Sequence, residues 1–162
     1  YSPITMARRH VTRYDEALPT FAAPSPERSR NMSAIKSKNT SPERKTRQAL
    51  HRDGFRFRLH ATAIPGSPDI VLARYRTVVF VHGCFWHGHE CRIGHIPRSN
   101  SEYWKAKIDR NVTRDARNFE ILRQNGWRVR VVRECSFGTD VGELIEELRK
   151  TRHDTGLRPR AA

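Results

Sequence analysis

The spacing of apolar and polar residues in the first half of the chain predicts one helix followed by three strands. Thr40, Pro42 and Glu43 mark the start of the helix. Thr40 can cap it, proline suits the first turn, and Glu43 stands three residues after the cap. We expect this helix to run to about Asp53 and to stop at Gly54.

Three stretches after this helix have the patterns of strands. Residues 55–60 alternate apolar and polar side chains, which is typical of a half-buried strand. A Pro- and Gly-containing loop at 64–68 separates this stretch from the next. Two apolar runs, 70–73 and 77–81, are joined by the turn 74–76 and predict a central hairpin.

The second half predicts a long loop and then a helix, a strand and a closing helix. The loop covers 82–99, and a long helix follows over 101–124, ended by Asn125-Gly126. Residues 127–132 predict a further buried strand, and 141–150 predict the closing helix. The order favours the α/β class, with a mixed central sheet and helices packed on it.

The chain of 162 residues is long enough for one domain with a single core. Residues 1–27 carry four of the nine prolines and have no clear periodicity. We therefore interpret 1–28 as a disordered arm, 29–152 as the folded domain and 153–162 as a flexible tail.

The net charge of +14 points to a polyanionic partner. Between Arg28 and Arg58 there are ten Lys or Arg residues, opposed only by Glu43 and Asp53. Such a basic stretch is typical of a surface that binds nucleic acid, although a membrane-surface patch or a solvated face would have the same composition. The chain has no apolar run typical of a signal peptide or a membrane helix, so we expect a cytoplasmic protein without a membrane partner.

The cysteines and neighbouring histidines suggest a zinc site. An odd number of cysteines, three, argues against a closed disulfide framework. Zinc takes four ligands in a tetrahedron, and three thiolates with one imidazole would satisfy it. On spacing alone, the nitrogen ligand is either of two histidines, and ordinary free thiols, with Cys135 in a buried strand, are the alternative. The candidates are Cys84, His87, His89, Cys91 and Cys135.

Asp69 and His82 are candidates for a catalytic site with a hard cation. Asp69 follows Pro68 at the mouth of an apolar strand, where its carboxylate could hold magnesium or simply form a turn. His82 ends a buried strand at the same edge, and His87 lies just beyond it. A carboxylate beside histidines can bind metal and activate water for attack on a phosphodiester. Glu43 could be a second acid, or only the helix cap.

Asp115 interrupts an otherwise apolar stripe on the long helix. The stripe consists of Trp104, Ile108, Val112, Phe119 and Leu122. We expect Asp115 to face inward with this stripe, where an unpaired carboxylate is costly. It therefore needs a partner, either a catalytic histidine or a structural hydrogen-bond donor.

Several apolar side chains are candidates for insertion into DNA. Phe85 and Trp86 form an aromatic pair inside a polar loop, and Trp104 lies near the start of the long helix. Aromatic or Met side chains inserted between base steps unstack DNA. Met32 follows Arg28-Ser29-Arg30 and is a candidate minor-groove wedge. Core packing is the alternative, above all for Trp104.

These motifs together resemble the very-short-patch repair endonucleases. Residues 80–87 read Phe-Val-His-Gly-Cys-Phe-Trp-His, and His89 and Cys91 follow. The resemblance extends over about residues 29–137, and its combination of motifs is highly specific. Other matching segments are Arg28-Ser29-Arg30-Asn31-Met32, Pro65-Gly66-Ser67-Pro68-Asp69, Tyr103-Trp104, Asn111 to Asp115, Gly126-Trp127-Arg128-Val129 and Glu134-Cys135.

The resemblance implies a PD-(D/E)xK restriction-endonuclease-like fold with a structural zinc and a catalytic magnesium ion. It implies nicking of double-stranded DNA 5′ to the thymine of a T·G mismatch, the lesion left when 5-methylcytosine deaminates. The partners implied beyond DNA are mismatch-repair proteins and a repair polymerase, and we expect a monomer.

The resemblance also assigns roles by position. It gives magnesium to Asp69 and the backbone of Val81, where the family has threonine, and it makes His82 and His87 the active-site histidines. Asp115 supports these histidines, and Glu43 matches a further acidic position. The zinc ligands are Cys84, His89, Cys91 and Cys135. The DNA-binding residues are Phe85, Trp86 and Trp104 as intercalating aromatics, Met32 as a wedge from the other groove, and Arg28 and Arg30.

Two other functions fit parts of this pattern. One is a nicking or restriction-type enzyme of a methylation-linked defence system. The other is a zinc-stabilised DNA-binding module without catalysis, which would need Asp69 or the histidines to be missing. The sequence departs from the family at Gly88 and Glu90, which replace histidines and are not expected to be ligands.

Overall fold

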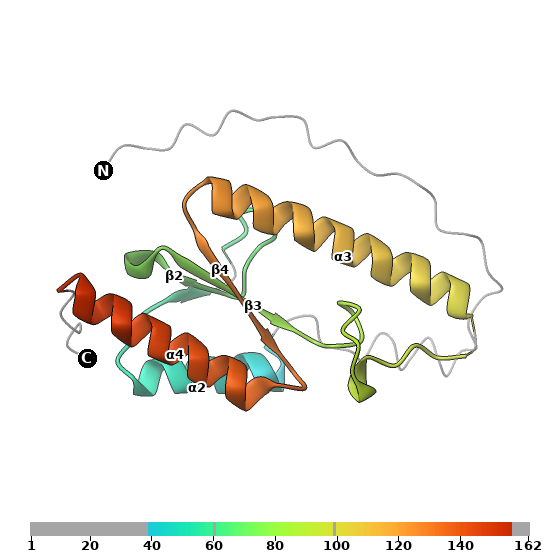
Figure 1. Ribbon diagram of the computed structural model, residues 1–162, viewed down its shortest axis with the longest axis horizontal. Coiled ribbons are helices and arrows are strands. Elements are labelled where there is room, and N and C mark those ends of the chain that lie inside the picture. Colours follow the sequence, from blue (N-terminus) through green and yellow to red (C-terminus); the bar gives the residue numbers. More distant parts are fainter. Residues whose placement is uncertain (1–38, 60, 99, 157–162) are drawn as a thin grey trace.

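The computed structural model describes residues 39–59, 61–98 and 100–156. Arg28, Arg30 and Met32 lie outside these ranges. The described chain is a mixed α/β structure whose sheet has helices on both faces (Figure 1). Its helices are α2 (Ser41–Arg52), α3 (Ser101–Gln124) and α4 (Phe137–Asp154), and its strands are β1 (Arg58–Leu59), β2 (Ile70–Leu72), β3 (Thr77–His82) and β4 (Arg128–Arg133).

The four strands lie in the order β1-β2-β3-β4. The predicted central hairpin is confirmed, because β2 pairs antiparallel with β3, with Ile70 opposite Val79. β4 pairs parallel with β3, and this register runs to His82 opposite Arg133. A parallel pair needs a crossover connection, which α3 provides.

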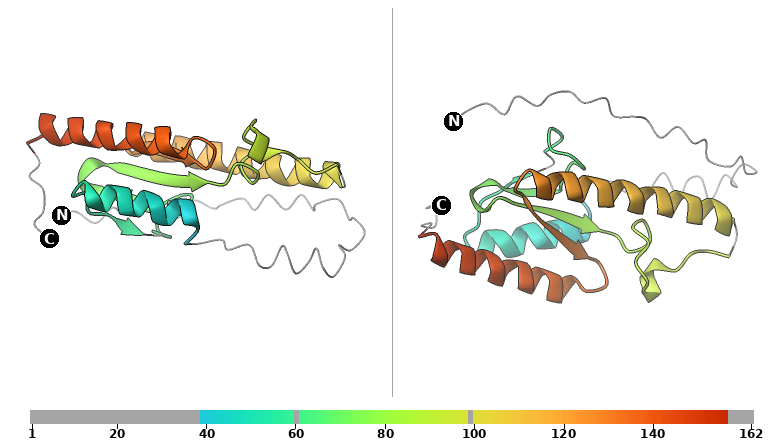
Figure 2. Two further views of the ribbon diagram at one scale, coloured as in Figure 1. Left: turned by 90° about the horizontal axis from the view of Figure 1, so that it is seen from below. Right: turned by 45° about the horizontal axis from the view of Figure 1, so that its top comes forward.

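Two apolar clusters attach the helices to the two faces of the sheet. Leu50 of α2 and Leu144 of α4 pack with Val132 on one face. Leu122 of α3 packs with Val78 and neighbouring residues on the other. The right-hand view of Figure 2 shows the same arrangement, with α3 on one side of the sheet and α2 and α4 on the other.

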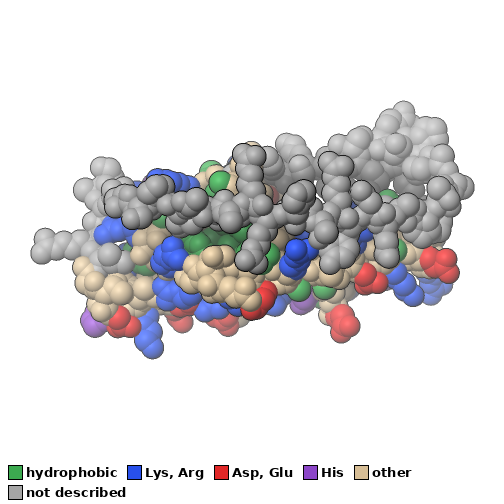
Figure 3. All heavy atoms as spheres, turned by 90° about the horizontal axis from the view of Figure 1, so that it is seen from above, with side chains coloured by type: hydrophobic (Ala, Val, Ile, Leu, Met, Phe, Trp, Pro, Cys, Tyr) green, Lys and Arg blue, Asp and Glu red, His purple; other side chains and the backbone are tan. Residues whose placement is uncertain are grey.

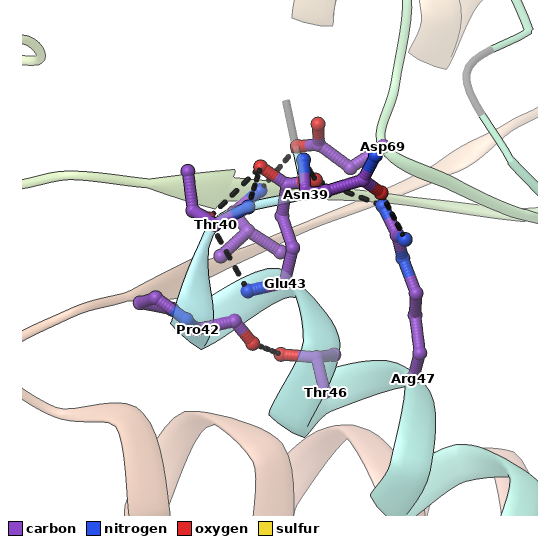
Figure 4. A network of polar contacts seen from close by, with 8 residues as sticks. Asn39, Thr40, Pro42, Glu43, Thr46, Arg47 and Asp69 are labelled. Atoms are coloured by element: carbon purple, nitrogen blue, oxygen red, sulfur yellow. Dashed lines mark hydrogen bonds and ion pairs between the residues drawn. The ribbon is translucent and has the colours of Figure 1, made fainter. Parts of the chain in front are cut away.

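The start of α2 has the predicted cap. The Thr40 hydroxyl oxygen accepts from the Glu43 backbone N–H at 3.4 Å, and the Glu43 carboxylate accepts from the Thr40 backbone N–H at 3.3 Å (Figure 4). Each group satisfies a donor that the first helical turn leaves unpaired. Arg47, one turn later, forms an ion pair with Glu43 at 2.8 Å. The cap thus holds a buried carboxylate in a fixed place.

Two predicted elements have different limits in the structure. The predicted strand at 55–60 is wrong in extent, because among its described residues, 55–59, only Arg58 and Leu59 pair with β2. Phe55 is fully buried against Tyr75, so packing of a non-strand segment produced part of the alternation. The closing helix is longer than the predicted 141–150, and it includes the first two residues of the expected tail, His153 and Asp154.

The apolar stripe of α3 faces the protein except at one position. Trp104, Ile108 and Leu122 are buried, as expected. Val112 is 43% exposed, so its predicted inward orientation is wrong. Val112 instead borders the loop after β3, since a Cβ added at Gly88 would lie 3.2 Å from its side chain.

Within the described ranges, no helix is long and apolar enough to cross a bilayer.

Candidate active site and metal site

The parallel pairing of β3 with β4 brings two cysteines together. The last aligned pair is His82 with Arg133, and the same register extended by two residues aligns Cys84 with Cys135. The loop after β3 then turns back, because the His89 backbone N–H donates to the Cys84 carbonyl at 3.1 Å. Ligating atoms of Cys84, His89, Cys91 and Cys135 all lie within 4.8 Å of one another.

This cluster has the dimensions that a tetrahedral zinc ion requires. Zn–S bonds of about 2.3 Å and Zn–N bonds of about 2.0 Å place neighbouring ligand atoms roughly 3.5–3.8 Å apart. Cys135 Sγ lies 3.3 Å from His89 Nδ1. His87 belongs to another cluster, so the geometry favours His89 as the nitrogen ligand. Cys135 is exposed and follows β4, which makes its alternative interpretation as a buried strand residue wrong.

The chemistry of the thiols also suits a cation. A hydrogen bond with His89 lowers the pKa of Cys91 to about 6. Burial raises the pKa of Cys84 to about 11, so this thiol needs a nearby positive charge to ionise at neutral pH. Gly94 allows the loop to close around the cluster, because a Cβ there would lie 2.0 Å from the His89 carbonyl oxygen.

A second cluster joins His82, His87 and Asp115, whose candidate ligand atoms also lie within 4.8 Å of one another. His87 Nδ1 is 2.6 Å from Asp115 Oδ2, and the rings of His82 and His87 stack with centroids 3.5 Å apart. The end of β3, the following loop and the middle of α3 supply these three residues. The expected histidine partner of Asp115 is therefore present.

The protonation of this cluster follows from its burial and its contacts. Burial, followed by the charge of His87, lowers the pKa of His82 to about 4, so His82 is neutral at pH 7. Burial raises the pKa of Asp115, but the hydrogen bond and charge of His87 outweigh it and leave that pKa below its usual value. Asp115 is therefore a carboxylate that can fix the orientation and tautomer of His87.

Asp69 lies beside β3 at the start of β2. Its Oδ2 accepts a hydrogen bond from the Val81 backbone N–H at 2.7 Å, which places the carboxylate next to the residue before His82. Figure 4 draws Asp69 in the same polar network as Glu43 and Asn39. Carboxylate oxygens are the ligands that magnesium prefers, so Asp69 fits such an ion. Asp69 is not a member of the histidine cluster as the structure describes it.

Several hydrogen bonds hold the Glu43 carboxylate in place, which leaves its role as a second acid a prediction. Its Oε2 accepts from the Asn39 backbone N–H at 3.0 Å and from Arg47, and its Oε1 accepts from the Thr40 hydroxyl at 2.9 Å. The residue is 3% exposed. The cap interpretation is thus confirmed, and Glu43 adds a fixed negative charge to the network that contains Asp69.

The aromatic candidates form one cluster at the start of α3. Phe85, Trp86 and Trp104 contact each other edge to face, with centroids 4.9–6.0 Å apart. Trp104 is 6% exposed, so core packing accounts for it. Phe85 and Trp86 are half-buried and lie on its solvent side. The cluster therefore has a packed base and a more accessible pair.

Two residues that the sequence analysis missed hold this cluster. Lys107 Nζ lies 5.3 Å from the centre of the Trp86 ring and 5.7 Å from those of Tyr103 and Trp104. Asn111 donates from Nδ2 to the Trp86 carbonyl at 3.0 Å. The spacing of four between positions 103, 107 and 111 places them on one helix face and could have indicated this group.

Comparison with known proteins identifies the family of the chain. Residues 23–93 match the family model described as DNA mismatch endonuclease Vsr. Type II nicking enzyme V.XorIIP of Xanthomonas oryzae pv. oryzae is 52% identical over 126 residues, which cover 77% of this chain and 92% of the relative. Type II nicking enzyme V.NmeAIP of Neisseria meningitidis is 50% identical over 104 residues, covering 64% and 74%.

A third relative carries the name of the family itself. DNA mismatch endonuclease Vsr of Escherichia coli is 43% identical over 109 residues, which cover 67% of this chain and 70% of the relative. These identities extend over most of each relative, so the likeness is not confined to one motif. The chain belongs to the Vsr family of DNA mismatch endonucleases.

Proposed function

We propose that this protein nicks one strand of duplex DNA 5′ to the thymine of a T·G mismatch. The observation that carries the proposal is the cluster of His82, His87 and Asp115, which lies beside Asp69 at one edge of the sheet in a Vsr-family chain. The mismatch preference rests on the name of the Escherichia coli relative. We also propose that residues 29–152 form a monomeric PD-(D/E)xK-type nuclease domain, with mismatch-repair proteins and a repair polymerase as later partners.

In the proposed chemistry, a carboxylate and a histidine have different roles. Asp69 and the Val81 carbonyl would hold magnesium, which supplies positive charge at the phosphate and lowers the pKa of water. His87 donates from Nδ1 to Asp115, which leaves the lone pair of Nε2 to accept a proton from the attacking water. His82, neutral and stacked on His87, holds that ring in place.

Zinc has a structural role in this proposal. The ion would join the loop after β3 to the residue that follows β4, through the ligands Cys84, His89, Cys91 and Cys135. Both His87 and the aromatic pair lie in the segment between the first two of these ligands. Fixing the loop therefore fixes the proton acceptor and the groups that we assign to mismatch recognition.

A nicking assay on closed circular DNA tests the function. One circle carries a single T·G mismatch, and its control has the same sequence with a T·A pair. With magnesium, we expect the mismatched circle alone to be converted to the nicked form, and no conversion in EDTA. Nicking of both circles would contradict the proposal.

The names of two relatives favour a second candidate, a type II nicking enzyme. Such an enzyme of a methylation-linked defence system would cut matched DNA at a methylation site. The two candidates are distinguished by fully matched circles that carry varied methylation sites. We expect these circles to stay intact, and nicking of any of them would favour the second candidate.

We expect Asp115→Asn to slow nicking by about a hundredfold, at the low end of general acid–base contributions. The amide can hydrogen-bond with His87 but lacks the charge that stabilises its protonated form. Single-turnover rates at saturating protein measure the effect, and Asp109→Asn, exposed on the same helix, is the matched control. A wild-type nicking rate for Asp115→Asn would show that the pair of His87 and Asp115 does not accept the proton of the attacking water.

We expect Trp86→Ala to weaken binding to a T·G duplex by about ten- to a hundredfold, with little effect on a matched duplex. Stacking on an aromatic returns roughly 1–3 kcal/mol per base, and a wobble pair costs less to unstack than a matched pair. Fluorescence anisotropy on both duplexes measures the difference. Trp127→Ala, whose ring lies beyond the other end of α3, controls for a general loss of packing.

Equal weakening on both duplexes would contradict the proposed role of Trp86. Trp86 would then be a packing residue of the zinc loop, as its contacts with Trp104 and Asn111 also allow.

A further inference from the structure

One side of α3 carries a row of cations that the proposed function does not use. The row consists of Lys107, Arg110, Arg114 and Arg117. At 3.6 residues per turn, these positions fall within about 80° of arc around the helix. Arg110, Arg114 and Arg117 are exposed. We call this row the α3 cationic stripe.

Three of the four acidic residues of α3 lie on another side of the helix, and the fourth, Asp115, contacts Arg114 of the stripe. Glu102, Asp109 and Glu120 cluster within about 20° of arc on another side, roughly 100° from the centre of the stripe. A space-filling view from the side of α3 shows Lys and Arg side chains along the long axis of the described surface, with some Asp and Glu side chains among them (Figure 3). The side of α3 that carries the stripe is therefore mainly positive.

Two residues of the α3 cationic stripe lie at the candidate site. Lys107 lies over the aromatic cluster, 5.3 Å from the Trp86 ring. Arg114 Nη2 lies 3.2 Å from Asp115 Oδ1, on the carboxylate whose other oxygen contacts His87. Its side chain is 59% exposed, so its guanidinium borders the site and reaches solvent. The stripe thus connects the aromatic pair with the proposed point of cleavage.

We propose that the α3 cationic stripe binds the phosphate backbone of one DNA strand along the site. Ten residues of helix from 107 to 117 rise about 15 Å. One DNA strand carries a charge about every 3.4 Å of duplex axis, but its phosphates wind around that axis, so a straight row of this length faces only some of them. The row is therefore complementary to the strand in charge and long enough to contact more than one phosphate.

The inference deepens the proposed function and rests on it for the choice of DNA. It adds a second basic surface to the stretch from Arg28 to Arg58, which the sequence analysis associated with nucleic acid. Each neutralised phosphate adds about 0.9 to the slope of log affinity against log salt on duplex DNA. The number of contacts from α3 can therefore be measured without any cleavage.

The test is the salt dependence of binding to a matched duplex, in EDTA, for the double variant Arg110→Gln/Arg117→Gln. We expect the slope to fall by about 1.8 and affinity to fall at every salt concentration. The charge-retaining variant Arg110→Lys/Arg117→Lys should keep the wild-type slope, which separates charge from local structure. Lys150→Gln, exposed on α4, is the matched control and should change nothing.

An unchanged slope in the Gln variant would overturn the proposal, as would an equal loss of slope in the Lys variant. A failure of this proposal can be distinguished from a failure of the proposed function. The first is measured by the salt dependence of binding to intact matched DNA, and the second by nicking at a mismatch. A reduced slope together with absent T·G nicking would keep the stripe and refute the mismatch activity.

Discussion

Replacement of Asp69 by Asn is expected to reduce nicking by at least about a thousandfold while duplex binding stays within a fewfold of wild type. The amide oxygen can still accept from the Val81 N–H, so the contact between β2 and β3 is retained. The charge that would hold magnesium is lost. Charge stabilisation by a catalytic metal is worth several kcal/mol, and each 1.36 kcal/mol is a factor of ten in rate.

Nicking rate and binding affinity must be measured on the same preparation of this variant. Asp154→Asn, at the end of α4 and far along the chain from the site, is the matched control and should behave as wild type. Retained nicking by Asp69→Asn would show that the metal-binding carboxylate lies elsewhere. A parallel loss of binding would mean that the substitution disturbed the fold and not the chemistry alone.

Replacement of Cys84 by Ser is expected to lower the melting temperature by roughly 10 °C or more. Structural zinc contributes about 10–16 kcal/mol in small domains. Loss of a quarter of that, about 3 kcal/mol, corresponds to roughly 10 °C for a domain of this size. Cys84 is buried two residues after β3, and Cys135, its proposed co-ligand, follows β4, so the substitution would remove a link between the ends of these two strands.

Thermal unfolding with and without a zinc chelator measures this effect. The chelator should lower the melting temperature of the wild type by more than it lowers that of Cys84→Ser, because the variant has already lost part of the zinc contribution. His95→Gln, exposed in the same loop and outside the ligand cluster, is the matched control. Freshly purified protein without zinc by elemental analysis, or a chelator without effect, would contradict a structural zinc ion.

Local patterns in the sequence predicted the elements whose signals are local. The cap of α2 and the hairpin of β2 and β3 depend on neighbouring residues, and both are confirmed. The extent of β1 depends on a partner strand, and Phe55 alternates with its neighbours because it packs in the core. Period-two alternation reports burial on one side, which a non-strand segment can also have.

In the candidate site too, some features were predictable from local patterns and others depend on distant parts of the chain. The burial pattern of α3 predicted that Asp115 needs a partner, and His87 is that partner. The choice of His89 over His87 for the Cys/His cluster depends on how the loop after β3 turns back onto Cys84, which spacing along the chain does not encode. The spacing of Lys107 and Asn111 places them on one face of α3, but their contacts with Trp86 also require the loop after β3 to lie on that face.

The most direct test of the central claim maps the nick at single-nucleotide resolution. Two duplexes of one sequence, one with a T·G mismatch and one with a T·A pair, are labelled at the end of each strand in turn and incubated with magnesium. The account predicts a single product, from the thymine strand of the mismatched duplex, cut immediately 5′ to the mismatched thymine. Cleavage of the guanine strand, or equal cleavage of the T·A duplex, would contradict it.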